Sequence, residues 1–352
     1  MLKTLLLVGL LLATQFVPLV YAAQVNTFIY HRFDETRYPS TNISAEIFSQ
    51  QLEYTKNQNI EVISLNELAT RLAAGTDLPE HAVSFCVDDA FRSFYDVGMP
   101  IIRKYGFPFT LFVNTDAVGT HGYLNWDELK ELVAEGVVIG NHTANHAYLV
   151  ELQPGETFPQ WKKRIQADIE KSQQQFEKHL GFKPTLFAYP YGEYHAEVVE
   201  IIKDAGFVAA FAQQSGVIHS GLNRYILPRF PMGGPFATFA GFKLKLAMKP
   251  LLVTKDDPFD PVIRDNPPVL RLQIPGKPIN PKRFNCFVQG DNRCWVEADK
   301  VNSPGEYRIH AEKPLTGRRN KYTLTLQSGQ GDWLWYSHLW VNAKNPVGKT
   351  VD

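Results

Sequence analysis

The sequence is poor in cysteine and has no excess of charge of either sign. Only three of its 352 residues are cysteines, and Lys plus Arg and Asp plus Glu each number 36. So few cysteines exclude a small disulfide-dense scaffold, and the charge balance excludes a polybasic nucleic-acid-binding protein. Because 44% of the residues are hydrophobic, the chain can form packed cores, and its length favours two domains over one.

Long hydrophobic runs are also lacking, except at the start of the chain. There, Lys3 precedes an apolar run over residues 5–12, which predicts a secretory signal peptide over residues 1–22. The alternative is a membrane anchor, which Gln15 and Pro18 disfavour because a span needs about 20 apolar residues in succession. We therefore expect a secreted or periplasmic protein with no stable membrane span after cleavage.

Two of the cysteines can be structural in an oxidising compartment. Cys286 and Cys294 lie on either side of a predicted turn at residues 290–292, and we expect them to form a disulfide. Cys86 lies within an apolar run, which is typical of a buried free thiol.

Short apolar runs alternate with helix-type segments between residues 26 and 212. The predicted strands are residues 27–30, 62–64, 83–87, 109–113, 137–140, 186–188 and 208–211. The predicted helices are residues 45–57, 67–74, 95–105, 126–135, 159–180 and 196–205. Strands of this kind, each followed by a helix, indicate an α/β fold with a parallel sheet. Seven to eight such units predict a distorted or incomplete (β/α) barrel, and no glycine-rich dinucleotide fingerprint follows the first strand.

The pattern changes after residue 250. A segment rich in Pro and Asp, 251–268, is predicted as a linker between a barrel domain at 23–250 and a small all-β, sandwich-like domain at 269–352. The strands predicted in the second domain are residues 269–274, 285–288, 294–298, 306–311, 321–327 and 333–341. The aromatic residues of the last strand fit core packing at least as well as stacking on sugar rings; they are Trp333, Trp335, Tyr336 and Trp340.

Unusual polar residues follow directly after several predicted strands. They are His31, the adjacent Asp88 and Asp89, and the pair His142 and His146. Because all parallel strands of a barrel open on one face, these side chains should converge there.

Two histidines spaced i, i+4 can reach one metal from a helical turn, and two histidines with one carboxylate form a hydrolytic zinc site. Of two neighbouring carboxylates, one can ligate while the other acts as a base. Alone, Asp88-Asp89 also fits a polar turn or a helix cap, and the histidines also fit an ordinary surface. Their combination favours a metal site. The Tyr-Pro-Tyr-Gly run at 189–192 is either a plain loop or the source of a backbone N–H for an oxyanion.

At these residues the sequence resembles the polysaccharide deacetylase family, carbohydrate esterase family 4. The family motif T-F-D-D-G is similar to residues 86–90, H-[ST]-x-x-H matches 142–146, and R-x-P-[YF]-G matches 188–192 without its arginine. Tyr-His-Arg at 30–32 and Phe-Ala-Tyr-Pro-Tyr-Gly at 187–192 resemble the branch of the biofilm poly-β-1,6-N-acetylglucosamine deacetylases.

The resemblance implies a role for each residue of the site. Asp89, His142 and His146 would hold a divalent metal, with zinc favoured. Asp88 would be the general base that acts on a water activated by the metal. The backbone N–H of Tyr191 would stabilise the tetrahedral oxyanion.

Two departures from the family pattern affect the turn beside Asp89 and the base. Ala90 replaces the motif glycine, and Ala188 replaces the arginine that orients the base. Arg92 or Arg229 could take the place of that arginine.

A third departure concerns the general acid. Where the family has an L-x-H motif, residues 226–230 read Ile-Leu-Pro-Arg-Phe and contain no histidine. His31 and His219 are the candidates to replace it, and water is the other possibility.

The sequence thus predicts a secreted, metal-dependent N-deacetylase of N-acetylglucosamine units in a polysaccharide, with poly-β-1,6-GlcNAc favoured over chitin or peptidoglycan. The alternative is a catalytically weak or inactive glycan-binding protein on the same scaffold. A third possibility is a metal-dependent amidase of a non-sugar substrate. No nucleic-acid partner is expected.

Overall fold

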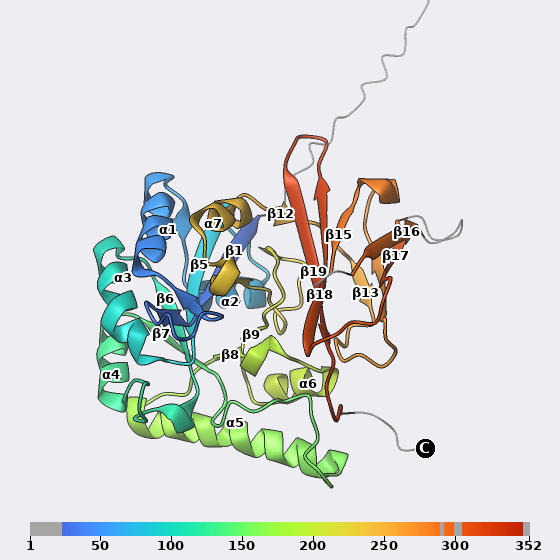
Figure 1. The fold of residues 1–352 in the computed structure, drawn as a ribbon. Coiled ribbons are helices and arrows are strands. Elements are labelled where there is room, and N and C mark those ends of the chain that lie inside the picture. The colour runs from blue at the N-terminus through green and yellow to red at the C-terminus, as the bar shows by residue number, and fades with distance from the viewer. Residues whose placement is uncertain (1–22, 289–291, 299–304, 348–352) are drawn as a thin grey trace, which may run out of the picture.

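A computed structural model describes residues 23–288, 292–298 and 305–347 of the chain, so the predicted signal peptide at 1–22 lies outside it. Figure 1 shows a helix-and-sheet part, coloured blue to yellow, beside an all-β part in orange and red. In the described ranges, no helix is both long and apolar enough to cross a membrane.

Six parallel strands form the centre of the first part. In spatial order they are β1 (Gln24–Tyr30), β5 (His81–Asp88), β6 (Phe109–Val113), β7 (Val138–Asn141), β8 (Leu186–Ala188) and β9 (Ala209–Phe211). Nearly every residue in them is buried, as expected for strands covered on both faces. Short strands flank this sheet or pair beside it: β2 (Arg32–Phe33), β3 (Asn42–Ile43), β4 (Glu61–Val62), β10 (Ile218–His219) and β11 (Phe230–Pro231).

A short segment, 227–231, lies between the two ends of this curved sheet. Leu227 forms a parallel bridge to Phe211 of β9, and β11 pairs in parallel with β1. The predicted distorted or incomplete (β/α) barrel is therefore confirmed, and its closure depends on single-residue and two-residue pairings.

The described residues contain seven α-helices, and Figure 1 shows them around the sheet. They are α1 (Ala45–Asn57), α2 (Leu65–Ala74), α3 (Met99–Tyr105), α4 (Trp126–Ala134), α5 (Phe158–Leu180), α6 (Ala196–Asp204) and α7 (Phe239–Leu246). Local signals account for their ends. Asn125 and Glu128 form a capping box at the start of α4, and α5 ends at Gly181 in the left-handed conformation. A π-helical turn, Phe94–Gly98, precedes α3, where the sequence predicts a single helix over 95–105.

Two four-stranded sheets form the all-β part. One has the order β12 (Lys249–Pro250), β19 (Trp333–Val341), β18 (Arg319–Gln327) and β15 (Asn285–Phe287). The other has the order β13 (Lys255–Asp257), β14 (Val269–Gln273), β17 (Glu306–Ala311) and β16 (Cys294–Ala298). The small all-β domain is thereby confirmed. The segment 251–268, predicted as a linker, supplies β13 to the second sheet.

The cysteines behave as predicted. A disulfide joins Cys286 on β15 to Cys294 on β16 and so links the two sheets. Cys86 is a buried free thiol.

Two tryptophans of β19 pack in different places, one in the core of the all-β part and one against the barrel. Trp340 is 1% exposed in the core shared by the two sheets. Trp335 packs against Phe230 of the barrel, with ring centroids 5.5 Å apart, and its Nε1 donates to the Ser215 carbonyl. These two side chains are therefore used in packing, while Trp333 is 39% exposed.

Candidate metal centre and active-site cleft

Three polar side chains that the sequence singles out meet beyond the carboxyl ends of β5 and β7. Asp89, His142 and His146 place one ligand atom each within 4.8 Å of the others. Nε2 of His146 lies 3.2 Å from Oδ1 of Asp89, and Nε2 of His142 lies 3.5 Å from the same oxygen. The structure thus brings together the predicted ligand set, from residues more than fifty positions apart in the chain.

The chemistry of this cluster fits a divalent ion. Nδ1 of His142 lies 2.7 Å from the Ala188 carbonyl oxygen, which can only accept, so Nδ1 carries the hydrogen and Nε2 offers its lone pair to the cluster. Oδ1 of Asp89 is buried and accepts no hydrogen bond from the described residues. A buried carboxylate oxygen in this state is costly, and a cation would compensate it. Two imidazole nitrogens and one carboxylate form a zinc-type donor set with open positions.

Strained backbone conformations concentrate around the cluster. Seven described non-glycine residues have positive φ, and five of them lie in the three motif loops: Asp89, Ala90, Thr143, His146 and Tyr191. Such conformations cost roughly 1–3 kcal/mol each and persist where surrounding contacts enforce them, often at functional sites. Ala90, with φ 55°, keeps the left-handed turn although it replaces the motif glycine.

The turn at Asp89 explains how two adjacent aspartates serve one site. Asp88 is the last residue of β5, and side chains of a continued strand would point to opposite faces. Instead, Asp89 has φ 77°, and its N–H donates to the Phe112 carbonyl of β6. The chain turns at this point, and Oδ2 of Asp88 lies 3.8 Å from Nε2 of His142.

The helical turn predicted for residues 142–146 is wrong, because this segment is a loop. Two side chains hold the loop. The Thr143 hydroxyl accepts from the His146 N–H at 3.0 Å, and the Asp168 carboxylate of α5 accepts from two further backbone N–H groups. These bonds bring the two imidazole centroids to 4.8 Å, so the i, i+4 spacing leads to convergence by a non-helical route.

Asp88 is bound by Arg229, one of the two arginines that the sequence offered as replacements. The contact is bidentate, with Nη1 2.7 Å and Nη2 2.9 Å from the two carboxylate oxygens, and both side chains are 0% exposed. Burial alone would raise the pKa of Asp88, but the guanidinium holds it below its usual value. Arg92 instead pairs with Glu128 on α4.

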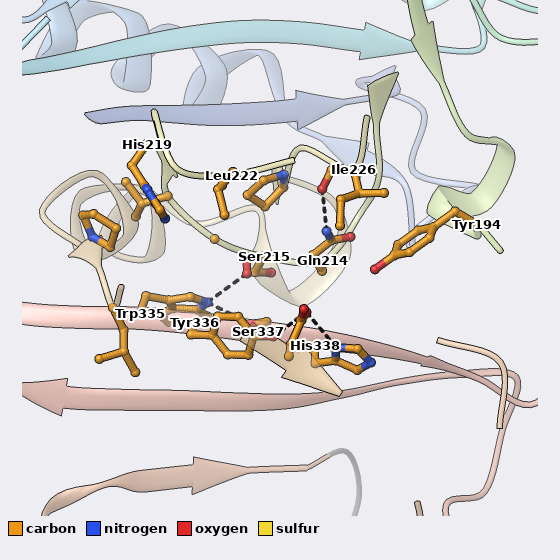
Figure 2. A pocket seen from close by; sticks show the side chains of 16 residues that line it. Tyr194, Gln214, Ser215, His219, Leu222, Ile226, Trp335, Tyr336, Ser337 and His338 are labelled. Atoms are coloured by element: carbon orange, nitrogen blue, oxygen red, sulfur yellow. Dashed lines mark hydrogen bonds and ion pairs between the residues drawn. The ribbon is translucent and has the colours of Figure 1, made fainter. Parts of the chain in front are cut away.

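Of the two candidate acids, only His31 lies at the cluster. A cavity of about 390 Å³ is lined by His31 together with Tyr191 and the three residues of the cluster, Asp89, His142 and His146. His219 lies on β10 in another cavity, of about 70 Å³, between the barrel and β19 (Figure 2). Burial lowers the pKa of His219 to about 4. Trp335 and His338 line that second cavity, and no member of the metal cluster does.

Tyr191 lies in a sharp turn at the edge of the cleft. It has φ 60° inside the turn Pro190–Gly192, and its ring packs against His146 at 4.5 Å and Tyr148 at 4.3 Å between centroids. No acceptor among the described residues takes a hydrogen bond from its backbone N–H. That N–H is therefore free to donate to a ligand.

The sequence reasoning missed the residues that tie this turn to the all-β part. Glu193 is fully buried, and Arg318 donates to both of its carboxylate oxygens, at 2.8 and 2.7 Å. The next residue, Arg319, places its guanidinium 5.3 Å from the Tyr191 ring centroid. No local pattern could reveal a pair that lies 125 residues apart.

Part of the chain, including the metal cluster and Tyr191, matches a known family model. Residues 75–210 match the family model described as Polysaccharide deacetylase. A poly-β-1,6-N-acetyl-D-glucosamine N-deacetylase of Staphylococcus aureus (strain MRSA252) is 26% identical over 211 residues, which cover 58% of this chain and 72% of that protein.

Two solved structures share the fold. The structure of IcaB from Ammonifex degensii has a TM-score of 0.54 and 25% identity, and the match covers 64% of this chain and 98% of that one. The Streptococcus pyogenes deacetylase PplD, in complex with acetate, has a TM-score of 0.57 and 21% identity, covering 64% and 99%.

Proposed function

Because residues 75–210 match the polysaccharide deacetylase family model, we propose that the protein is a metal-dependent hydrolase of N-acetyl groups on N-acetylglucosamine units of a polysaccharide. One observation carries the proposal. A buried carboxylate with a bidentate arginine partner lies beside a His, His, Asp cluster, and the cluster opens into a cavity of about 390 Å³. A binding protein has no need of such a combination.

The proposed reaction consumes one water and converts the acetamide into a free amine and acetate. A divalent ion held by Asp89, His142 and His146 would act as a Lewis acid on water and on the acetyl carbonyl. Asp88, kept ionised and oriented by Arg229, accepts the proton of the attacking water.

Two further residues complete the reaction. The backbone N–H of Tyr191 donates to the oxygen on which negative charge develops. His31 faces the same cavity and delivers a proton to the leaving amine. Exchanging His31 for Gln should therefore slow acetate release by about 10²-fold or more.

Among the glycans, poly-β-1,6-GlcNAc is the favoured substrate because the relative from Staphylococcus aureus carries that activity in its name. We also propose export of the protein to the periplasm or the medium, on the basis of residues 1–22. Sequencing the mature amino terminus of secreted protein would locate the cleavage.

The test is acetate release from β-1,6-GlcNAc, chitin and peptidoglycan oligomers, with the metal content of the protein measured alongside. Turnover should fall on chelation, return with zinc, and disappear in Asp88→Asn. The matched control is Asp77→Asn, because Asp77 is exposed and belongs to none of the motifs. Tight glycan binding without turnover under any metal would instead favour a non-catalytic glycan-binding protein.

A further inference from the structure

A third cavity, distinct from the one beside His219, extends from the cleft at the metal cluster onto the all-β part. Its volume is about 640 Å³, and both it and the cleft lie within the size range of ligand pockets. Four residues line both of them: Tyr191, Gln213, Phe236 and Arg319. The two cavities therefore form one continuous depression, and the part over β18 is called the β18 groove below.

Strand alternation explains which side chains of β18 face this groove. Arg319, Lys321 and Thr323 line it, whereas the intervening Tyr322 and Leu324 are fully buried in the sandwich core. Successive side chains of a strand point to opposite faces. One strand thus supplies both the core of the all-β part and a wall of the cleft.

Aromatic side chains border the groove. Phe236 is 55% exposed and Phe287 is 56% exposed, and both line it. Exposed apolar surface rimmed by polar groups marks a binding groove. A polysaccharide with one unit at the metal cluster would lay its neighbouring units over these rings.

The charges of the groove are all of one sign. Its described lining residues include Arg318, Arg319 and Lys321 but no Asp or Glu. Arg318 and Arg319 share the carboxylate of Glu193. Arg318 also pairs with Glu151 at 2.6 Å, whereas Arg319 pairs with no carboxylate other than that of Glu193 in the described residues.

Lys321 is the least compensated of these cations. Its Nζ contacts the Ser215 hydroxyl at 3.5 Å, and it forms no ion pair with a carboxylate in the described ranges. Burial and the adjacent charge of Arg319 lower the pKa of Lys321 to about 8. Lys245 lies nearby, with its Nζ 5.2 Å from the Phe236 ring, and adds a further positive charge.

We propose that the β18 groove holds the sugar units next to the one being deacetylated, and that Lys321 and Arg319 exclude units that already carry a free amine. This inference rests on the proposed function. An acetamide is neutral, whereas the product amine is an ammonium ion near neutral pH. Lys321, which has no carboxylate partner in the described residues, and Arg319, which shares Glu193 with Arg318, repel that ammonium ion. The enzyme therefore acts on acetylated stretches of the polysaccharide and avoids units next to one that it has already deacetylated.

The test uses five-unit GlcNAc oligomers that are either fully acetylated or carry one free amine at the second or the fourth unit. The ratio of kcat/KM for acetate release on the two kinds of substrate is measured, with mass spectrometry locating each new amine. The native enzyme should prefer the fully acetylated oligomer over at least one isomer by about tenfold or more. In Lys321→Glu the ratio of the two kcat/KM values should fall to about one.

A control and a second variant keep the result interpretable. Lys277→Gln removes an exposed lysine of the all-β part outside the groove and should keep the native ratio. Lys321→Met tests the same charge if Lys321→Glu fails to fold. A native ratio near one for both isomers, or a ratio that both Lys321 variants retain, would overturn the inference. Failure of the proposed function would look different, because no substrate would then release acetate.

Discussion

Replacing Arg229 by Met should destabilise the protein by about 3–5 kcal/mol. Asp88 and Arg229 are both 0% exposed and joined by two short bonds. Removing one partner of a buried ion pair leaves the other charge without compensation, at a typical cost of about 3–5 kcal/mol. The loss of two charge-assisted hydrogen bonds, at about 1.5–3 kcal/mol each, would cost about 3–6 kcal/mol in total, which overlaps that range. In addition, Nε of Arg229 donates to the Ala212 carbonyl, which would lose its donor.

The assay is urea denaturation near neutral pH. The free energies of unfolding of the variants are compared, and they are comparable where the m-value is unchanged. Arg92→Met is the matched control, because the Arg92–Glu128 pair is partly exposed and such pairs contribute about 0–1 kcal/mol. A double-mutant cycle with Asp88→Asn should show strong coupling between Asp88 and Arg229. If Arg229→Met costs no more than Arg92→Met, or if the Arg229 and Asp88 changes are additive, the assignment of Arg229 as the stabilising partner of Asp88 is refuted.

Three further predictions concern the turn at Tyr191 and the all-β part. Gly192→Ala should lower both stability and acetate release, because Gly192 has φ 71° and an added Cβ would lie 2.3 Å from Cβ of Gln213; thermal unfolding and turnover check this. Glu193→Gln should loosen the contact between the two parts, since Arg318 then loses a charged partner, and limited proteolysis should cut the chain faster. Lys321→Met should raise the free energy of unfolding near neutral pH by at most about 3 kcal/mol, because the pKa of Lys321 falls from 10.5 to about 8 on folding. Since the penalty of burying that charge disappears between about pH 8 and 10.5, the advantage of Met should vanish over this interval in pH-dependent denaturation.

Elements with strong local signals could be predicted from the sequence. The strands at 109–113 and 186–188 and the helix at 45–57 have the predicted bounds. Buried strands of a parallel sheet are short continuous apolar runs, and a serine cap at residue 44 marks the start of that helix. Apolar runs and helix caps depend on residues that are close together in the sequence, so they can be recognised from the sequence alone.

Features that depend on distant residues could not be predicted in the same way. Segment 227–231 closes the barrel through pairings of one or two residues and contains two prolines, so it shows no strand periodicity. The loop at 142–146 owes its shape to the carboxylate of Asp168 on α5. Asp88 and Arg229 are separated by 141 residues, and only the closure of the barrel decides that Arg229, rather than Arg92, reaches Asp88.

Two of the departures from the family motifs are offset by contacts or conformations within this chain, because Ala90 keeps the left-handed turn and Arg229 binds Asp88. Ala188 is fully buried and supplies the carbonyl that orients His142, while Arg229 reaches Asp88 from the segment that closes the barrel. The all-β part acts on the same site through consecutive residues of β18, because Arg318 holds the carboxylate beside the Tyr191 turn and Arg319 lies over the Tyr191 ring. Since a one-residue shift in strand register exchanges the two faces of a strand, the packing of the sandwich core also fixes which charges face the cleft. The two parts of the chain therefore shape one cleft, and separating them should impair the Tyr191 turn as well as the β18 groove.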